Sequence, residues 1–123
     1  MKKIHTDKAP AAVGPYSQAV EINGMIYTSG QIALDPATGE LVGETIEEQA
    51  EQVMKNLMAI LEAGGTKPEN VVKTLCFLTD IGDFAAFNEV YAKYFTEKPA
   101  RSCVGIKSLP KGAICEVEVI AAI

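Results

Sequence analysis

The segment 71–79 places the strongest limit on how this chain can fold. It reads V-V-K-T-L-C-F-L-T, a short run rich in β-branched and aromatic residues, which is typical of a strand. Strand side chains alternate between two faces, and here both faces are apolar. The two sets are Val71, Leu75 and Phe77 on one face, and Val72, Cys76 and Leu78 on the other. A strand of this kind belongs inside a sheet that is covered on both sides.

Two helices are predicted around this strand. The first should begin at Thr45, because Thr45 and Glu48 have the spacing of a capping box, and it should end at Gly64-Gly65. Apolar residues recur between these ends at helical spacing, at Ile46, Ala50, Val53, Leu57, Ile60 and Leu61. The second helix should start near Asp83, carry the stripe Phe84, Phe87, Tyr91 and Tyr94, and end where 96–99 interrupts it.

Further strands are predicted toward both ends of the chain. Residues 19–22 and 25–29 flank Asn23-Gly24, which favours a two-residue hairpin turn, and 35–39 reads as a turn. Two helices can cover only one face of a sheet of five or six strands. We therefore expect other copies of the chain to cover the second face, so that the protein is an oligomer.

Size and charge exclude several classes of protein. The chain has 123 residues, which suits one domain spanning 1–123, and its net charge of −5 does not favour nucleic acid or anionic lipid as a partner. Three cysteines fit no zinc or disulfide framework, and His5 is the only histidine. No signal peptide is recognisable. We expect a reduced, cytoplasmic protein without a metal site or a Ser-His-Asp triad.

The C-terminal segment 99–119 carries the most suggestive polar residues. It predicts two strands joined by a loop, with Arg101 and Cys103 on the first strand and Glu116 on the second. If the two strands pair directly, Glu116 lies near the position opposite Cys103. A guanidinium, a thiol and a carboxylate would then share one patch of the sheet, and the arginine fork would suit a ligand with a carboxylate.

Four sequence blocks resemble the Rid family (YjgF/RidA, reactive intermediate deaminases). They are G-P-Y-S-Q-A at 14–19, Y-T-S-G-Q at 27–31, D-F-A-A-F-N-E-V-Y at 83–91, and the segment 99–119. The resemblance implies a chorismate-mutase-like α+β fold, a mixed sheet with two helices on one face, and a homotrimer with ligand clefts between subunits. It also implies hydrolysis of 2-imino or 2-enamino acids to 2-keto acids and ammonia, without a cofactor or a metal.

The same resemblance assigns roles to individual residues. Arg101 would bind the substrate carboxylate and Glu116 would orient the attacking water. The remaining residues would border the ligand: Tyr16 at the mouth, Ser29 and Gly30 along the cleft, Asn88 near the site, and Cys103 chiefly through its backbone.

Each of these residues also has a simpler interpretation. Pattern alone does not separate Glu116 from Glu118, which shares its face, and Asn88 is expected to face away from the aromatic stripe into solvent. Cys103 has no histidine near it in sequence, so a small buried hydrophobe is favoured over a nucleophile. Three other functions stay open: a keto-acid-binding regulator, a ribonuclease or translation inhibitor as attributed to some family members, and a holdase.

Overall fold

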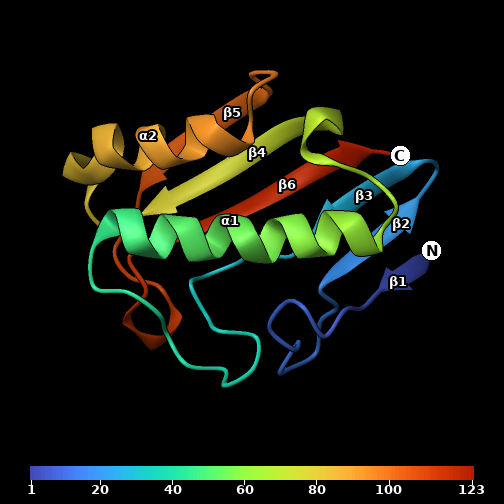
Figure 1. Ribbon diagram of the computed structural model, residues 1–123, viewed down its shortest axis with the longest axis horizontal. Coiled ribbons are helices and arrows are strands. Elements are labelled where there is room, and N and C mark those ends of the chain that lie inside the picture. The colour runs from blue at the N-terminus through green and yellow to red at the C-terminus, as the bar shows by residue number, and fades with distance from the viewer.

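Six strands form one mixed sheet in the computed structural model, which describes residues 1–123 (Figure 1). Their order across the sheet is β1-β2-β3-β6-β4-β5. The strands are β1 (Lys2–Ile4), β2 (Ala19–Ile22), β3 (Met25–Thr28), β4 (Val71–Leu78), β5 (Ala100–Gly105) and β6 (Cys115–Ala122). The short edge strand β1 was not expected from the sequence, because three residues carry too little pattern to predict a strand.

Two α-helices, α1 (Ile46–Ala63) and α2 (Phe84–Tyr94), lie on the same face of the sheet (Figure 1). The capping box is confirmed: the Glu48 amide donates to Thr45 Oγ1 at 3.2 Å, and the Thr45 amide donates to Glu48 Oε1 at 3.2 Å. Gly64 caps the other end, as predicted. Three 3₁₀ turns complete the fold: η1 (Pro68–Asn70), η2 (Ile81–Asp83) and η3 (Pro110–Gly112). None of the helices combines the length and the apolar character needed to span a membrane.

The predicted N-terminal hairpin is confirmed. Strands β2 and β3 are antiparallel, and the turn residues Asn23 and Gly24 have φ angles of 51° and 75°. Two positive φ values in succession are the geometry that an Asn-Gly pair favours. This hairpin fixes the end of β3, beyond which Ser29 and Gly30 lie.

The expected pairing of the two C-terminal strands is wrong. Strand β4 lies between them, parallel to β5 and antiparallel to β6, so that Cys103 is opposite Cys76 and Glu116 is opposite Phe77. The strand with two apolar faces takes the interior position, and α2 supplies the crossover that a parallel β4–β5 pair requires. The connection between β5 and β6 is long enough to pass β4.

The assignment of the first residues of β4 to faces also needs correction. A bulge between Val71 and Lys73 leaves Val72 exposed and places Val71 on the helix-covered face with Thr74, Cys76 and Leu78. A bulge adds one residue to one strand and thereby reverses the alternation before it. Only Leu75 and Phe77 remain as apolar residues of β4 on the other face.

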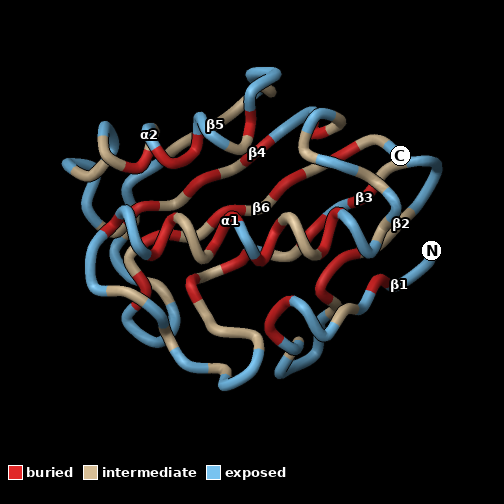
Figure 2. Tube along the Cα trace, viewed as in Figure 1, coloured by how far each residue is buried: buried red, intermediate tan, exposed pale blue.

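The two faces of the sheet differ in their cover. The face toward the helices contributes to a continuous cluster of 18 buried residues, among them Leu57, Phe87 and Val117 (Figure 2). The other face has no helix on it and leaves Tyr27 and Val104 each 41% exposed, with Leu75 and Phe77 half-buried (Figure 1). The predicted arrangement of two helices on one face is thus confirmed, and the second apolar face stays open in a single chain.

Candidate functional site

Arg101 lies on the edge strand β5 and directs its side chain toward α2. Its Nη1 donates to Asn88 Oδ1 at 2.7 Å. Its Cζ lies 4.7 Å from the centroid of the Tyr91 ring and 5.3 Å from that of Phe84. The ion pairs of the chain join His5 to Asp7 and Lys93 to Glu51, so no carboxylate neutralises this half-buried guanidinium.

Asn88 does not face away from the aromatic stripe, contrary to the expectation. It follows Phe84 by four residues and precedes Tyr91 by three, so all three lie on one face of α2. Together they form a support for the Arg101 guanidinium. A groove of about 310 Å³ lies beside it, lined by Tyr91, Phe95, Lys98 and Pro99 among others.

Glu116 lies on β6 and points to the open face of the sheet. The bridge between Gln31 and Val117, with amide-to-carbonyl distances of 2.9 and 3.1 Å, brings Gly30 against it. A Cβ on Gly30 would lie 2.6 Å from Glu116 Cδ and 2.9 Å from Oε2. The glycine therefore leaves the space that the Glu116 carboxyl group occupies.

Burial raises the pKa of Glu116, and the negative charge of Glu118 raises it further. Both effects disfavour the ionised form. A carboxylate with a raised pKa is a stronger base than an ordinary surface glutamate. It is therefore suited to accept a proton from water.

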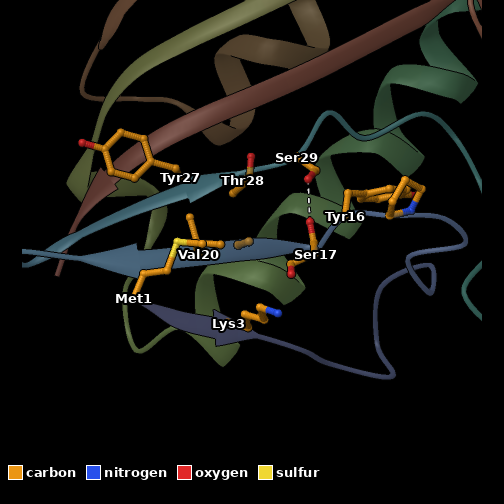
Figure 3. A pocket seen from close by; sticks show the side chains of 10 residues that line it. Met1, Lys3, Tyr16, Ser17, Val20, Tyr27, Thr28 and Ser29 are labelled. Carbon is orange, nitrogen blue, oxygen red and sulfur yellow. Dashed lines mark hydrogen bonds between the residues drawn. The ribbon is translucent and has the colours of Figure 1, made fainter.

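Tyr16 and Ser29 border a hollow of about 620 Å³ near the N-terminal strands. Tyr16, Ser17 and Ser29 lie at one end of it and Tyr27 at the other (Figure 3). Ser29 Oγ donates to the Ser17 carbonyl at 2.5 Å, so this hydroxyl is committed to the backbone, whereas the Tyr16 side chain is 54% exposed. The Tyr16 ring is thus available to a ligand or to a second chain.

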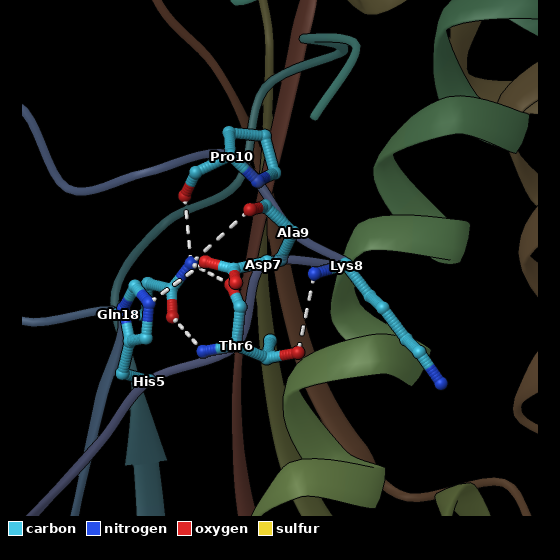
Figure 4. A network of polar contacts seen from close by, with 7 residues as sticks. All are labelled: His5, Thr6, Asp7, Lys8, Ala9, Pro10 and Gln18. Atoms are coloured by element: carbon cyan, nitrogen blue, oxygen red, sulfur yellow. Dashed lines mark hydrogen bonds and ion pairs between the residues drawn. The ribbon is translucent and has the colours of Figure 1, made fainter. Parts of the chain in front are cut away.

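A buried glutamine ties the loop before Tyr16 to the sheet. Gln18 Nε2 donates to the carbonyls of Thr6, Ala9 and Pro10 at 2.8–3.3 Å, and its Oε1 accepts from the Thr6 amide at 2.7 Å (Figure 4). The Gln18 carbonyl in turn accepts from the Ser29 amide at 2.9 Å. One side chain therefore anchors the N-terminal segment against the strand end that carries Ser29.

Cys103 has the surroundings of a packing residue. Its side chain packs against the main core, and burial raises its pKa despite the opposing influence of Arg101. The chain's only histidine, His5, contacts Asp7 on the surface, so no histidine is available to activate the thiol. A protonated thiol without a base is a poor nucleophile. No three of the His, Cys, Asp and Glu side chains lie close enough together to hold a metal ion.

Within one chain the predicted residues form two groups that do not meet. Arg101, Asn88 and Cys103 lie on the helix side of the β5 edge, whereas Glu116 and Gly30 lie at the open face. Two strand spacings (roughly 10 Å) and three residues of strand length (also roughly 10 Å) separate the backbones of Arg101 and Glu116. The predicted convergence of guanidinium, thiol and carboxylate in one chain is therefore wrong.

The sequence pattern placed Phe84 and Tyr91 in the aromatic stripe of the second helix and gave Thr74 no role. Thr74 lies opposite Arg101 on β4, and its Oγ1 is 2.7 Å from the Tyr91 hydroxyl. The spacing of Phe84, Asn88 and Tyr91 by four and three residues could have revealed a shared helix face. The contact of that face with Arg101 depends on how α2 packs, which no local pattern shows.

Comparison with known proteins agrees with this arrangement. The model of the family described as endoribonuclease L-PSP matches residues 6–123. The chain belongs to the Rid family. It is 53% identical over 98% of its length, and 97% of the relative, to AldR of Lactococcus lactis, which is named as a candidate regulator. It is 50% identical to the 2-iminobutanoate/2-iminopropanoate deaminase of Mus musculus, over 98% of this chain and 90% of the relative.

Solved structures of other Rid proteins share the fold. The structure of RidA from the Antarctic bacterium Psychrobacter superposes with a TM-score of 0.96, at 49% identity over 100% of both chains. That of TdcF from E. coli with bound serine gives 0.95, at 42% identity over 100% of this chain and 99% of TdcF. The α+β fold predicted for this Rid chain is therefore confirmed.

Proposed function

We propose that this Rid chain hydrolyses reactive 2-imino and 2-enamino acids to 2-keto acids and ammonia. The substrates would be small, such as 2-iminopropanoate, 2-iminobutanoate and 2-aminoacrylate. The observation that carries the proposal is the Arg101 guanidinium, which is half-buried, supported by Asn88 and two aromatic rings, and paired with no carboxylate. A half-buried cation without a carboxylate partner favours an anionic ligand, and a guanidinium fits a carboxylate with two parallel hydrogen bonds.

Two comparisons support the class of substrate. The mouse relative is named as a deaminase of 2-imino acids, and TdcF was solved with serine, a small amino acid with a free carboxylate. A 2-imino acid has the same carboxylate beside a carbon that carries nitrogen. The ligand chemistry suggested by Arg101 and the names of these relatives therefore agree.

The working site is proposed to form between two copies of the chain. Arg101 lies at the edge of the sheet and Glu116 on its open face, so one chain cannot place both against one small molecule. The open face also exposes apolar side chains that a second copy would bury, including Tyr27 and Val104. The homotrimer implied by family resemblance supplies such contacts, with Arg101 from one copy beside Glu116 and Gly30 from another.

Arg101 and Glu116 supply the two functions that the hydrolysis needs, which are binding of the substrate carboxylate and transfer of a proton from water. Arg101 holds the carboxylate of the substrate, and the Glu116 carboxylate takes a proton from water as the water oxygen attacks the C=N carbon. The resulting carbinolamine receives that proton on nitrogen, which returns Glu116 to the carboxylate form. The C–N bond then breaks as the C=O bond forms, the Glu116 carboxylate takes the proton of the hydroxyl group, and ammonia leaves. An enamine first takes a proton on carbon to become the imine. Because a protonated imine carbon is already electrophilic, no covalent nucleophile takes part.

Mixing two inactive variants tests this proposal directly. Arg101→Ala and Glu116→Gln should each lose imine hydrolysis when they are alone. Co-expression with different tags and purification of the mixed trimer should restore about a third of the sites, because each mixed trimer has one interface that joins an intact Arg101 to an intact Glu116. Imine decay in a coupled threonine dehydratase reaction measures the recovery.

The matched control mixes Glu116→Gln with the double variant Arg101→Ala/Glu116→Gln. No site in that mixture contains Glu116, so activity should stay absent. Equal activity in both mixtures, after subunit exchange is verified by the tags, would contradict a site shared between copies.

A keto-acid-binding regulator is the second candidate, because AldR is named as a candidate regulator. The same Arg101 receptor would then bind a 2-keto acid without turnover. Tight binding of 2-oxobutanoate by calorimetry together with unchanged imine decay would favour this function. The name of the family model also raises RNA cleavage, but the net charge of −5 does not attract RNA.

A further inference from the structure

We propose that Tyr91, held by Thr74, is a positioning residue that fixes the Arg101 guanidinium for its carboxylate ligand. The inference rests on the proposed role of Arg101 as an anion receptor. It adds Thr74 and Tyr91, two residues to which the sequence analysis gave no role in the site. Neither of them is expected to touch the substrate.

The first support is the register of the sheet. Thr74 lies directly opposite Arg101 on the neighbouring strand, and both side chains point toward α2. Thr74 is 0% exposed and its Oγ1 lies 2.7 Å from the Tyr91 hydroxyl. A buried polar pair of this kind has few alternative arrangements, because losing the partner leaves a hydroxyl without a hydrogen bond.

The second support is the position of the Tyr91 ring. The hydroxyl is tied to β4 and the backbone to α2, so the ring between them is held at both ends. The Arg101 Cζ lies 4.7 Å from its centroid, nearer than to the Phe84 ring at 5.3 Å. Tyr91 is 8% exposed and Phe84 39%, so Tyr91 is the more rigid of the two supports.

The third support is the division of hydrogen-bond donors on Arg101. Asn88 accepts from Nη1, and the ring of Tyr91 lies under the guanidinium carbon. A guanidinium has five N–H donors in a planar fork, so most of them stay free for a ligand in the same plane. Asn88 and Tyr91 thus set the orientation of the fork without using the donors that a carboxylate needs.

The state of the Tyr91 hydroxyl agrees with this role. Burial raises the pKa of Tyr91, although the hydrogen bond to Thr74 and the charge of Arg101 act in the opposite direction. The phenol therefore stays neutral at physiological pH and does not form an ion pair with Arg101. The guanidinium keeps its full charge for the ligand.

Two double variants separate the aromatic face from the hydroxyl. Tyr91→Phe/Thr74→Val removes both polar groups but keeps the ring, and Tyr91→Leu/Thr74→Val removes the ring as well. Replacing both partners avoids leaving one buried hydroxyl unpaired. Val90→Ala is the matched control, because it removes buried apolar volume from the same helix at a residue without a contact to Arg101.

The readouts are KM and kcat for imine hydrolysis and the Kd of 2-oxobutanoate, with the neutral 2-oxobutanamide as a comparison ligand. Tyr91→Leu/Thr74→Val should raise KM and the Kd of 2-oxobutanoate by about tenfold, with a smaller change in kcat. Binding of the amide should change little. Tyr91→Phe/Thr74→Val keeps the ring but loses its attachment to β4, so it should raise the Kd of 2-oxobutanoate by a smaller factor, about threefold, and Val90→Ala should bind both ligands normally. A Kd unchanged in Tyr91→Phe/Thr74→Val would remove Thr74 from the inference.

Normal binding of 2-oxobutanoate by Tyr91→Leu/Thr74→Val would overturn the inference, as would equal losses for both ligands or for Val90→Ala. Should that variant fail to fold, Tyr91→Met/Thr74→Val takes its place, because methionine fills irregular space without a ring. Arg101→Ala distinguishes the two proposals. If Arg101→Ala binds 2-oxobutanoate normally, the proposed function itself fails; if it loses binding while the ring variant does not, only the role of Tyr91 fails.

Discussion

Arg101 and Glu116 lie on opposite faces of one sheet, and a single chain completes only one of their two surroundings. Around Arg101, α2 and β4 supply a hydrogen bond, two aromatic rings and a buried hydroxyl pair. Around Glu116, the chain supplies the space above Gly30 and a second carboxylate, Glu118, but no cover. A single chain therefore completes the surroundings of the proposed anion receptor, Arg101, whereas it leaves the proposed base, Glu116, on a surface that a second copy would have to cover.

The largest effect is expected from Arg101→Ala. Loss of the receptor should lower kcat/KM for imine hydrolysis by about a thousandfold, because the substrate loses its main charged contact. The free energy of unfolding should change by less than about 1 kcal/mol, since the side chain lies at the sheet edge. Kinetics and thermal unfolding measure the two quantities.

Arg101→Lys is the control for Arg101→Ala. It keeps the charge but loses the planar fork, and it should recover only a small part of the activity. Full activity in Arg101→Ala would show that Arg101 and the residues around it have no role in the reaction.

Glu116→Gln should lower kcat by roughly a hundredfold while the Kd of 2-oxobutanoate stays near the wild-type value. The amide has nearly the same shape as the carboxyl group but does not accept the proton from water. Calorimetry and the imine-decay assay measure binding and turnover separately. If binding of 2-oxobutanoate were lost together with turnover, the Glu116 carboxylate would bind the ligand rather than activate water.

Gly30→Ala tests the position of the Glu116 carboxyl group without altering the surroundings of Arg101. The new methyl group would lie 2.6 Å from Glu116 Cδ, so the carboxyl group must move. We expect about a tenfold loss of kcat with normal binding of 2-oxobutanoate. Gly24→Ala is unsuitable as a control because its φ is 75°. Gly105→Ala is the better one, because the added methyl group would lie 3.3 Å from its nearest neighbour, Ile81 Cβ, and away from Glu116. Unchanged kcat in Gly30→Ala would argue against a fixed position for the carboxylate.

Glu118→Gln should change the pH dependence without a large loss of maximum rate. The base must be ionised, so kcat/KM falls as pH drops through the pKa of Glu116. Burial raises that pKa and the charge of Glu118 raises it further. Removing the charge should lower the pKa and move the acid limb to lower pH, whereas Glu118→Asp should not. If the acid limb of the pH profile does not move, the group that titrates in the assay is not Glu116.

The smallest effect is expected from Cys103→Ala, with kcat within about twofold of the wild type. The thiol is packed against the core and its pKa is raised by burial, so it takes no covalent part in the reaction. Incubation with an iodoacetamide reagent before the assay checks the same point in the wild-type protein. A loss comparable to that of Arg101→Ala would require a mechanism through a covalent intermediate.

Local sequence patterns determined the elements of this protein. The capping box at Thr45 and Glu48, the Asn23-Gly24 turn and the alternation of side chains over 75–78 depend on neighbours within a few residues. Each can therefore be read directly from the chain. The family resemblance pointed to Arg101 and Glu116 for the same reason. Its four blocks are short runs of consecutive residues, and they can be recognised without knowing the tertiary structure.

Only the tertiary structure decided how these pieces meet. It placed β4 between β5 and β6, shifted Val72 into a bulge, and turned Arg101 and Glu116 to opposite faces. It also brought Tyr91 over Arg101 through a hydroxyl pair formed across 17 residues of sequence. Strand order and helix packing result from burying apolar surface over the whole chain, and a pattern of neighbouring residues does not contain that information.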